Sequence, residues 1–161
     1  MAQVYISVGS NINRAANIRA ARQALVAEFG ALVVSQVYES EAVGFNGPAF
    51  YNLVIGAQTE QSPQQVAQRL KAIELDNGRC KTAEKFSNRT LDLDLLLYDD
   101  VICDEGVQIP RHEITENAFV LWPLAEVAPQ LRHPLTQQNY QEMWASYPHQ
   151  QNLKPIPFDW Y

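Results

Sequence analysis

The chain has 161 residues and is poor in cysteine, in basic residues and in long apolar runs. Its two cysteines, Cys80 and Cys103, allow at most one bridge and belong to no Cys-x-x-Cys or Cys/His cluster, which argues against a disulfide scaffold and a structural zinc site. No apolar run approaches the roughly 18 residues that a membrane helix needs. The N-terminal residues also lack the basic and apolar regions of a signal peptide. We therefore expect a cytoplasmic protein that does not act at a membrane.

The scarcity of basic residues also limits the partners of the protein. Twelve Lys and Arg against eighteen Asp and Glu give a net charge of −6, which argues against a general binder of nucleic acids. The hydrophobic fraction of 47% is too high for a disordered chain. At this length we expect one domain over residues 1–161, and we expect a monomer.

The first hundred residues alternate between patterns typical of strands and of helices. Residues 62–65 hold the clearest signal, because Ser62, Pro63 and Gln65 form the capping box that begins a helix. Gly30 is expected to end an earlier helix. The predicted order is strand, helix, strand, strand, helix, strand, over residues 4–8, 14–29, 32–38, 50–57, 62–77 and 91–98. This is the split βαββαβ order of the ferredoxin-like α+β fold, with the helices on one face of an antiparallel sheet.

The pattern is looser after residue 99 and forms a C-terminal extension of that core. A short hairpin is expected over residues 101–109, and helices are expected over residues 116–127 and 140–147. The final residues, 148–161, are rich in proline and aromatic residues. They are compatible with a docked tail or with a loose one.

Two aspartates in the last predicted strand are the sharpest chemical feature. Side chains alternate along a strand, so Asp92 and Asp94 share one face and the leucines at 91, 93, 95 and 97 share the other. Two unpartnered carboxylates in an apolar setting are costly, and Mg²⁺ relieves this by binding one or two carboxylates together with phosphate oxygens. A solvated strand face is the alternative.

A basic segment precedes this strand. Residues 79–89 carry four basic residues and one acidic residue, a local charge of +3 in a chain of −6. A cationic loop beside paired carboxylates suits a nucleoside polyphosphate with its magnesium ions. An ordinary solvated loop is the alternative.

Several motifs together resemble the 6-hydroxymethyl-7,8-dihydropterin pyrophosphokinase family of folate biosynthesis. The resemblance covers residues 4–131. It rests on Y-I-S-V-G-S-N over residues 5–11, F-Y-N over 50–52, R-T-L-D-L-D over 89–94 and F-V-L-W-P-L-A-E-V-A-P over 119–129. The family has a ferredoxin-like fold, which agrees with the strand order predicted above.

The resemblance implies transfer of pyrophosphate from ATP to the pterin hydroxymethyl group, with release of AMP. It implies that Asp92 and Asp94 hold two Mg²⁺ ions, and that Asp94 also orients the attacking hydroxyl. Arg79, Arg89 and Asp94 would be the catalytic residues. Pterin contacts are implied for Ser40, Val43, Phe50, Asn52 and Phe119. ATP contacts are implied for Lys81, Arg89, Leu95, Arg111 and His112.

The sequence departs from the family pattern between the predicted hairpin and the following helix. Arg111 stands where the family usually has a histidine, and Asn117 stands where it usually has an arginine. The alternative function is therefore a diverged relative that binds a pterin or a nucleotide with weak or no turnover. Phe50 and Phe119 also have a simpler interpretation as core residues.

Overall fold

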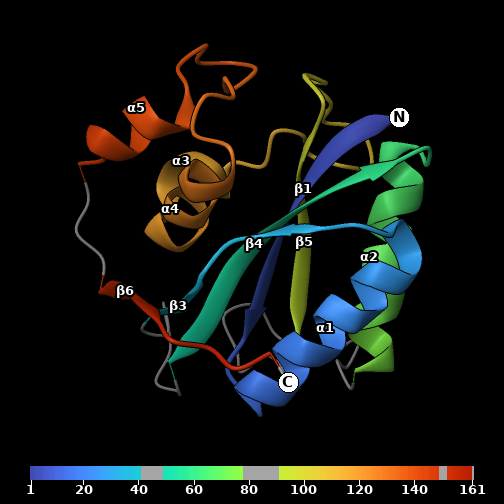
Figure 1. The fold of residues 1–161 in the computed structure, drawn as a ribbon. Helices are drawn as coiled ribbons and strands as arrows, with labels where there is room; N and C mark the ends of the chain where they lie inside the picture. The colour runs from blue at the N-terminus through green and yellow to red at the C-terminus, as the bar shows by residue number, and fades with distance from the viewer. Residues whose placement is uncertain (41–48, 78–90, 149–151, 161) are drawn as a thin grey trace.

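The computed structural model describes residues 1–40, 49–77, 91–148 and 152–160. Its elements are β1 (Ala2–Ser10), α1 (Arg14–Phe29), β2 (Val33–Val34), β3 (Val37–Ser40), β4 (Phe50–Thr59), α2 (Pro63–Asp76), β5 (Asp92–Tyr98), α3 (Glu113–Glu116), α4 (Ala118–Val127), α5 (Tyr140–Ala145) and β6 (Leu153–Ile156). Figure 1 shows them arranged around one sheet.

The strands form an antiparallel sheet in the order β5-β1-β4-β3-β6, with β2 also paired to β4. Without β6, this is the strand order of a split βαββαβ unit, so the predicted α+β fold is confirmed. The expected second strand is divided into β2 and β3. The break lies at Ser35, whose hydroxyl accepts a hydrogen bond from the backbone N–H of Val54 at 2.9 Å.

Helices α1 and α2 cover one face of the sheet and enclose the larger core (Figure 1). The predicted signals at their ends are confirmed. Gly30 has a positive φ of 82° directly after α1, and its N–H donates to the carbonyl of Val26. Ser62 and Gln65 form both hydrogen bonds of the capping box at the start of α2, which fixes where this helix begins.

The expectation that the two helices of the βαββαβ core share one face of the sheet is confirmed by α1 and α2. Helices α3, α4 and α5, which belong to the C-terminal extension, lie on the opposite face and form a second core (Figure 1). The expectation that Leu97 shares a face with Leu93 and Leu95 is wrong. A register shift between Tyr5 and Ile6 lets Leu95 pair with Ile6 and Leu97 pair with Tyr5. This irregularity leaves Leu96 and Leu97 together in the second core, while Leu93 and Leu95 stay in the first.

The C-terminal segment docks against the sheet. β6 pairs with β3, so that Leu153 lies opposite Ser40. Phe158 and Trp160 pack against the first core, and the guanidinium groups of Arg19 and Arg22 lie over their rings. Of the two interpretations of the tail, docking is therefore the one found.

The remaining differences from the predicted elements are local. The expected hairpin over residues 101–109 is reduced to a single bridge between Cys103 and Ile109. Within the expected helix over residues 116–127, α4 begins only at Ala118 and continues through Pro123. None of the described helices is long and apolar enough to cross a membrane.

Candidate active site

A row of paired residues crosses three strands on the face that α4 covers. Gly9 of β1 lies opposite Asp92 of β5 on one side and opposite Asn52 of β4 on the other. Directly paired residues of a sheet project to the same face. The row therefore connects the predicted metal ligands with the predicted pterin contact.

Gly9 leaves open the space between the two polar side chains. A Cβ atom at this position would lie 3.0 Å from Oδ1 of Asn52 and 3.8 Å from Cδ1 of Phe50. Any larger residue would have to displace the amide of Asn52. The geometry explains why the strand carries a glycine where β propensity alone would disfavour one.

Asp92 and Asp94 project from β5 to this same face and are both partly exposed. The residues between and after them, Leu93 and Leu95, are buried in the opposite core. The backbone N–H of Leu93 donates a 2.7 Å hydrogen bond to Oε2 of Glu74, a buried carboxylate on α2. Among the described strands β5 lies at the edge of the sheet, and Glu74 supplies an acceptor for its backbone and so holds the strand that carries the aspartates.

Asn52 and Ser40 form a buried polar pair beside this row. The amide nitrogen of Asn52 donates to the hydroxyl of Ser40 at 2.6 Å, and each residue is 6% exposed. Phe50 lies two residues before Asn52 on β4 and shares its face. Phe119 lies in the first turn of α4, partly buried against the second core on this side of the sheet.

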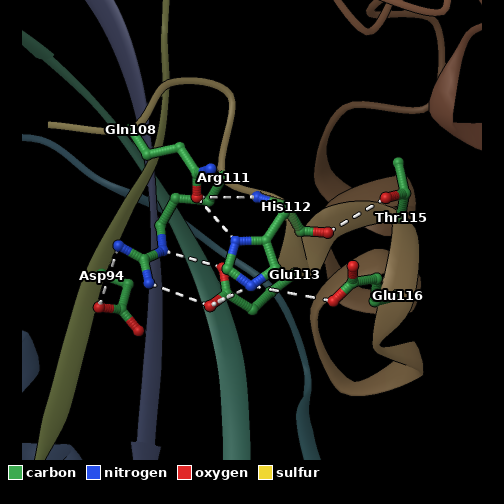
Figure 2. Close-up of polar contacts among 7 residues, drawn as sticks. All are labelled: Asp94, Gln108, Arg111, His112, Glu113, Thr115 and Glu116. Carbon is green, nitrogen blue, oxygen red and sulfur yellow. Dashed lines mark hydrogen bonds and ion pairs between the residues drawn. The ribbon is translucent and has the colours of Figure 1, made fainter. Parts of the chain in front are cut away.

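Arg111 approaches the aspartates from the segment before α3 (Figure 2). Its Nη1 lies 3.8 Å from Oδ1 of Asp94, while Nε and Nη2 donate to the two carboxylate oxygens of Glu113 at 3.0 Å each. Burial alone would lower the pKa of the Arg111 guanidinium, but the carboxylates of Asp94, Glu113 and Asp92 outweigh it and raise that pKa. The same pairing lowers the pKa of Glu113, although burial opposes it. Both groups therefore stay charged at neutral pH.

His112 turns to the other side of the same segment (Figure 2). Its Nδ1 lies 2.7 Å from Oε1 of Gln108, and its Nε2 lies 3.4 Å from Glu113 and 3.8 Å from Glu116. The side chain is 52% exposed. Of the two residues predicted here for ATP, Arg111 is therefore the one that faces the aspartates.

Four predicted site residues lie outside the described residues: Val43, Arg79, Lys81 and Arg89. A fifth, Leu95, is described and is 4% exposed in the core under α1 and α2. Its side chain faces away from the aspartates, so the structure does not bring this side chain into the candidate site.

Three residues of the site were not predicted in these roles. Gly9, Glu74 and Glu113 are not among the site residues that the sequence predicts. Glu113 follows Arg111 by two positions, and this spacing of opposite charges is the one signal in the sequence that hints at the pair. The partners of Gly9 and Glu74 come from distant strands and helices, which a single sequence does not reveal.

Comparison with known proteins agrees with this arrangement. The profile of the 7,8-dihydro-6-hydroxymethylpterin-pyrophosphokinase family matches residues 5–129. The chain is 34% identical over 159 residues to the 2-amino-4-hydroxy-6-hydroxymethyldihydropteridine pyrophosphokinase of Aquifex aeolicus, covering 97% of this chain and 96% of that protein. The enzyme of the same name from Pseudomonas aeruginosa is 36% identical over 137 residues, covering 82% and 84% of the two chains.

Solved structures support the fold. The HPPK-DHPS protein of Plasmodium falciparum superposes with a TM-score of 0.70 at 13% identity, over 91% of this chain. The match covers 44% of that longer chain, so this chain spans less than half of it. By its matched profile and its relatives, the chain belongs to the 7,8-dihydro-6-hydroxymethylpterin-pyrophosphokinase family.

Proposed function

We propose that the protein transfers pyrophosphate from ATP to the hydroxymethyl group of 6-hydroxymethyl-7,8-dihydropterin and releases AMP. The observation that carries the proposal is the row formed by Asp92, Gly9 and Asn52, which brings a carboxylate pair and a buried amide to one face. A phosphate donor and a flat, polar-edged heterocycle need these two kinds of group side by side. The names of the relatives supply the identity of the two substrates.

The two aspartates suit Mg²⁺. They supply hard oxygen ligands from one strand face, and Mg²⁺ takes one or two carboxylates when phosphates and water complete its octahedron. Among the described residues, no three His, Cys, Asp or Glu side chains gather into an all-protein cage. We propose that Asp92 and Asp94 hold the two ions that accompany ATP. When bound, the ions would neutralise charge on the phosphates and act as Lewis acids.

The chain's own residues would position the reacting groups. The hydroxymethyl oxygen forms a bond to the β-phosphorus of ATP, and the bond between that phosphorus and the oxygen bridging to the α-phosphorus breaks. The bridging oxygen leaves with AMP, and the hydroxyl proton passes to solvent. Asp94 would accept the hydrogen bond of the attacking hydroxyl and so orient it for in-line attack.

Asn52 and Ser40 would bind the edge of the pterin. The hydroxyl of Ser40 accepts one amide proton of Asn52, which fixes the plane of the amide and directs its remaining polar groups. Phe50 shares this face and would contact the heterocycle together with Phe119, which lies on the same side of the sheet. We propose Val43 as a further pterin contact.

The phosphates would be bound by basic residues around the aspartates. Of these basic residues, Arg111 is the one that the described part of the chain contains, and its Nη1 lies 3.8 Å from Oδ1 of Asp94. We propose that Arg79, Lys81 and Arg89 bind phosphate oxygens together with it. A guanidinium stabilises the charge that develops during transfer more strongly than water does, because it is already oriented.

The test is release of AMP from ATP and Mg²⁺, measured with and without the dihydropterin. We expect AMP release that requires the pterin, and we expect Asp92→Ala to lower the rate by at least a hundredfold, since it removes half of the carboxylate pair. Exposed Asp104→Ala is the matched control, and it should retain the wild-type rate. Absence of pterin-dependent AMP, or full activity in Asp92→Ala, would overturn the proposal.

A further inference from the structure

Arg111 is held between two acidic groups at unequal distances (Figure 2). Two of its three guanidinium nitrogens form 3.0 Å hydrogen bonds with Glu113, whereas the third lies 3.8 Å from Asp94. The guanidinium group is planar and rigid, so the two hydrogen bonds to Glu113 set the direction of the third nitrogen. Glu113 therefore determines how closely Arg111 approaches the predicted metal ligand.

The backbone fixes both residues of this pair. The N–H of Arg111 donates to the carbonyl of Leu96 on the edge strand β5 at 3.1 Å. The carbonyl of Arg111 accepts from Ile114, a fully buried residue of α3. Glu113 is the first residue of α3, so its position follows from the same helix. The distance between Arg111 and Asp94 is thus set by two anchored segments rather than by a free surface side chain.

The guanidinium and a divalent cation would both be attracted to Asp94. In the protein without ligands, Arg111 offsets part of the repulsion between the two aspartate carboxylates. The same positive charge opposes a metal ion that arrives at those carboxylates. Glu113 cancels much of this charge and keeps Nη1 beyond hydrogen-bonding distance of Asp94.

We propose that Arg111 acts as a substitute cation for the aspartate pair in the ligand-free protein, and that Glu113 is the positioning residue that keeps it weakly held there. When nucleotide and metal bind, a phosphate oxygen then takes the place of Asp94 as the partner of Nη1, while Nε and Nη2 stay on Glu113. This inference rests on the proposed function, since it takes Asp94 as a metal ligand.

The proposal predicts effects of opposite sign for the two members of the pair. Arg111→Gln removes the competing cation, so the protein without nucleotide should bind Mn²⁺ about three- to fivefold more tightly. The same variant should bind a non-hydrolysable ATP analogue with Mg²⁺ about tenfold more weakly, because a charged hydrogen bond to phosphate is lost. Glu113→Gln frees the charge of Arg111 and should weaken Mn²⁺ binding about twofold to threefold.

A double-mutant cycle distinguishes an effect of Glu113 that acts through Arg111 from a direct effect of the Glu113 charge on the metal. If Glu113 acts through Arg111, Glu113→Gln should lose nearly all of its effect on Mn²⁺ binding in the Arg111→Gln background. Glu116→Gln is the matched control. Glu116 lies on the same short helix and contacts His112 at 3.8 Å, and its contacts among the described residues do not include Arg111. This control should leave Mn²⁺ binding unchanged.

The experiment is titration of Mn²⁺ into the full chain without nucleotide, followed by electron paramagnetic resonance, for wild type and each variant. Asp94→Asn is included to identify the site, and Arg111→Met serves as a second neutral variant if Arg111→Gln does not fold. Tighter binding in either neutral variant, with the loss of the Glu113→Gln effect in the double variant, supports the proposal. Unchanged or weaker Mn²⁺ binding in the neutral variants overturns it, as does a Glu113→Gln effect of equal size in both backgrounds.

The same titration distinguishes this inference from the proposed function. If wild type binds no Mn²⁺, or if Asp94→Asn binds it as wild type does, the metal assignment within the proposed function is wrong and the inference fails with it. If Asp94→Asn loses binding while the neutral Arg111 variants match wild type, the metal assignment stands. In that case only the role of Arg111 and Glu113 is wrong.

Discussion

Asn52 and Asp92 come from different strands, yet both lie directly opposite Gly9. The small residue between them separates the predicted pterin contact from the predicted metal ligand by one strand of the sheet. A transfer between two bound molecules needs such adjacent sites, with no side chain in between.

Gly9→Ala should raise the KM for the pterin about tenfold, because the new Cβ lies 3.0 Å from Oδ1 of Asn52 and forces the amide to move. Gly56→Ala is the matched control. Its Cβ would lie equally close, 3.0 Å, to the ring of Tyr5 on the same two strands, but at a pair further along the sheet. Both variants should lose about 1–3 kcal/mol of stability from overpacking, and only Gly9→Ala should alter the KM. Equal KM values in the two variants would contradict the assignment of Asn52.

Ser40→Ala should leave one amide proton of Asn52 without its acceptor in a buried setting. We expect a stability loss of about 1–3 kcal/mol, measured by urea unfolding. The KM for the pterin should also rise, since the plane of the amide is no longer fixed. Ser146→Ala, which removes an exposed hydroxyl from the end of α5, is the control and should change neither quantity by much. A variant with reduced stability and an unchanged KM would limit Ser40 to a structural role.

Glu74→Ala should destabilise the edge strand β5. It removes the acceptor of the buried N–H of Leu93, and a charged hydrogen bond of this kind contributes about 1.5–3 kcal/mol. Urea unfolding measures the loss, with the exposed Glu60→Ala as control. We also expect weaker Mn²⁺ binding, because Leu93 lies between the two aspartates. A loss below about 0.5 kcal/mol would show that the strand is held by other contacts.

Truncation after residue 151 should expose the outer edge of β3. The strand then loses its pairing with β6, and the contacts of Phe158 and Trp160 with α1 disappear as well. Hydrogen exchange followed by mass spectrometry should show faster exchange in β3, which ends at Ser40, while β1 keeps its protection. Unchanged exchange in β3 would indicate that β6 adds little to the stability of this edge.

The sequence was sufficient for the fold wherever local signals were strong. The capping box at Ser62, the glycine after α1 and the alternation along β5 each predicted an element that the structure contains. The position of Leu97 could not be predicted, because a register shift depends on the partner strand and leaves no mark in β5 itself. The face covered by the helices after residue 112 could not be predicted, since no local pattern decides which side of a sheet a later helix covers.

In the candidate site, too, local features could be predicted from the sequence and long-range contacts could not. Asp92 and Asp94 could be placed on one face by their spacing alone. The side-by-side position of Asn52, Gly9 and Asp92 depends on which strands pair and in which register, and only the sheet reveals it. Glu113 could not be recognised as the partner of Arg111, because the hydrogen bonds of the pair depend on where α3 begins.

In the reaction that we propose, pyrophosphate rather than a single phosphate moves to the pterin. The most direct test is ³¹P nuclear magnetic resonance of a reaction that contains the protein, ATP, Mg²⁺ and 6-hydroxymethyl-7,8-dihydropterin. We predict that AMP and a pterin diphosphate ester appear in equal amounts and that both require the pterin. Formation of ADP with a pterin monophosphate, or of AMP without any pterin ester, would contradict the account.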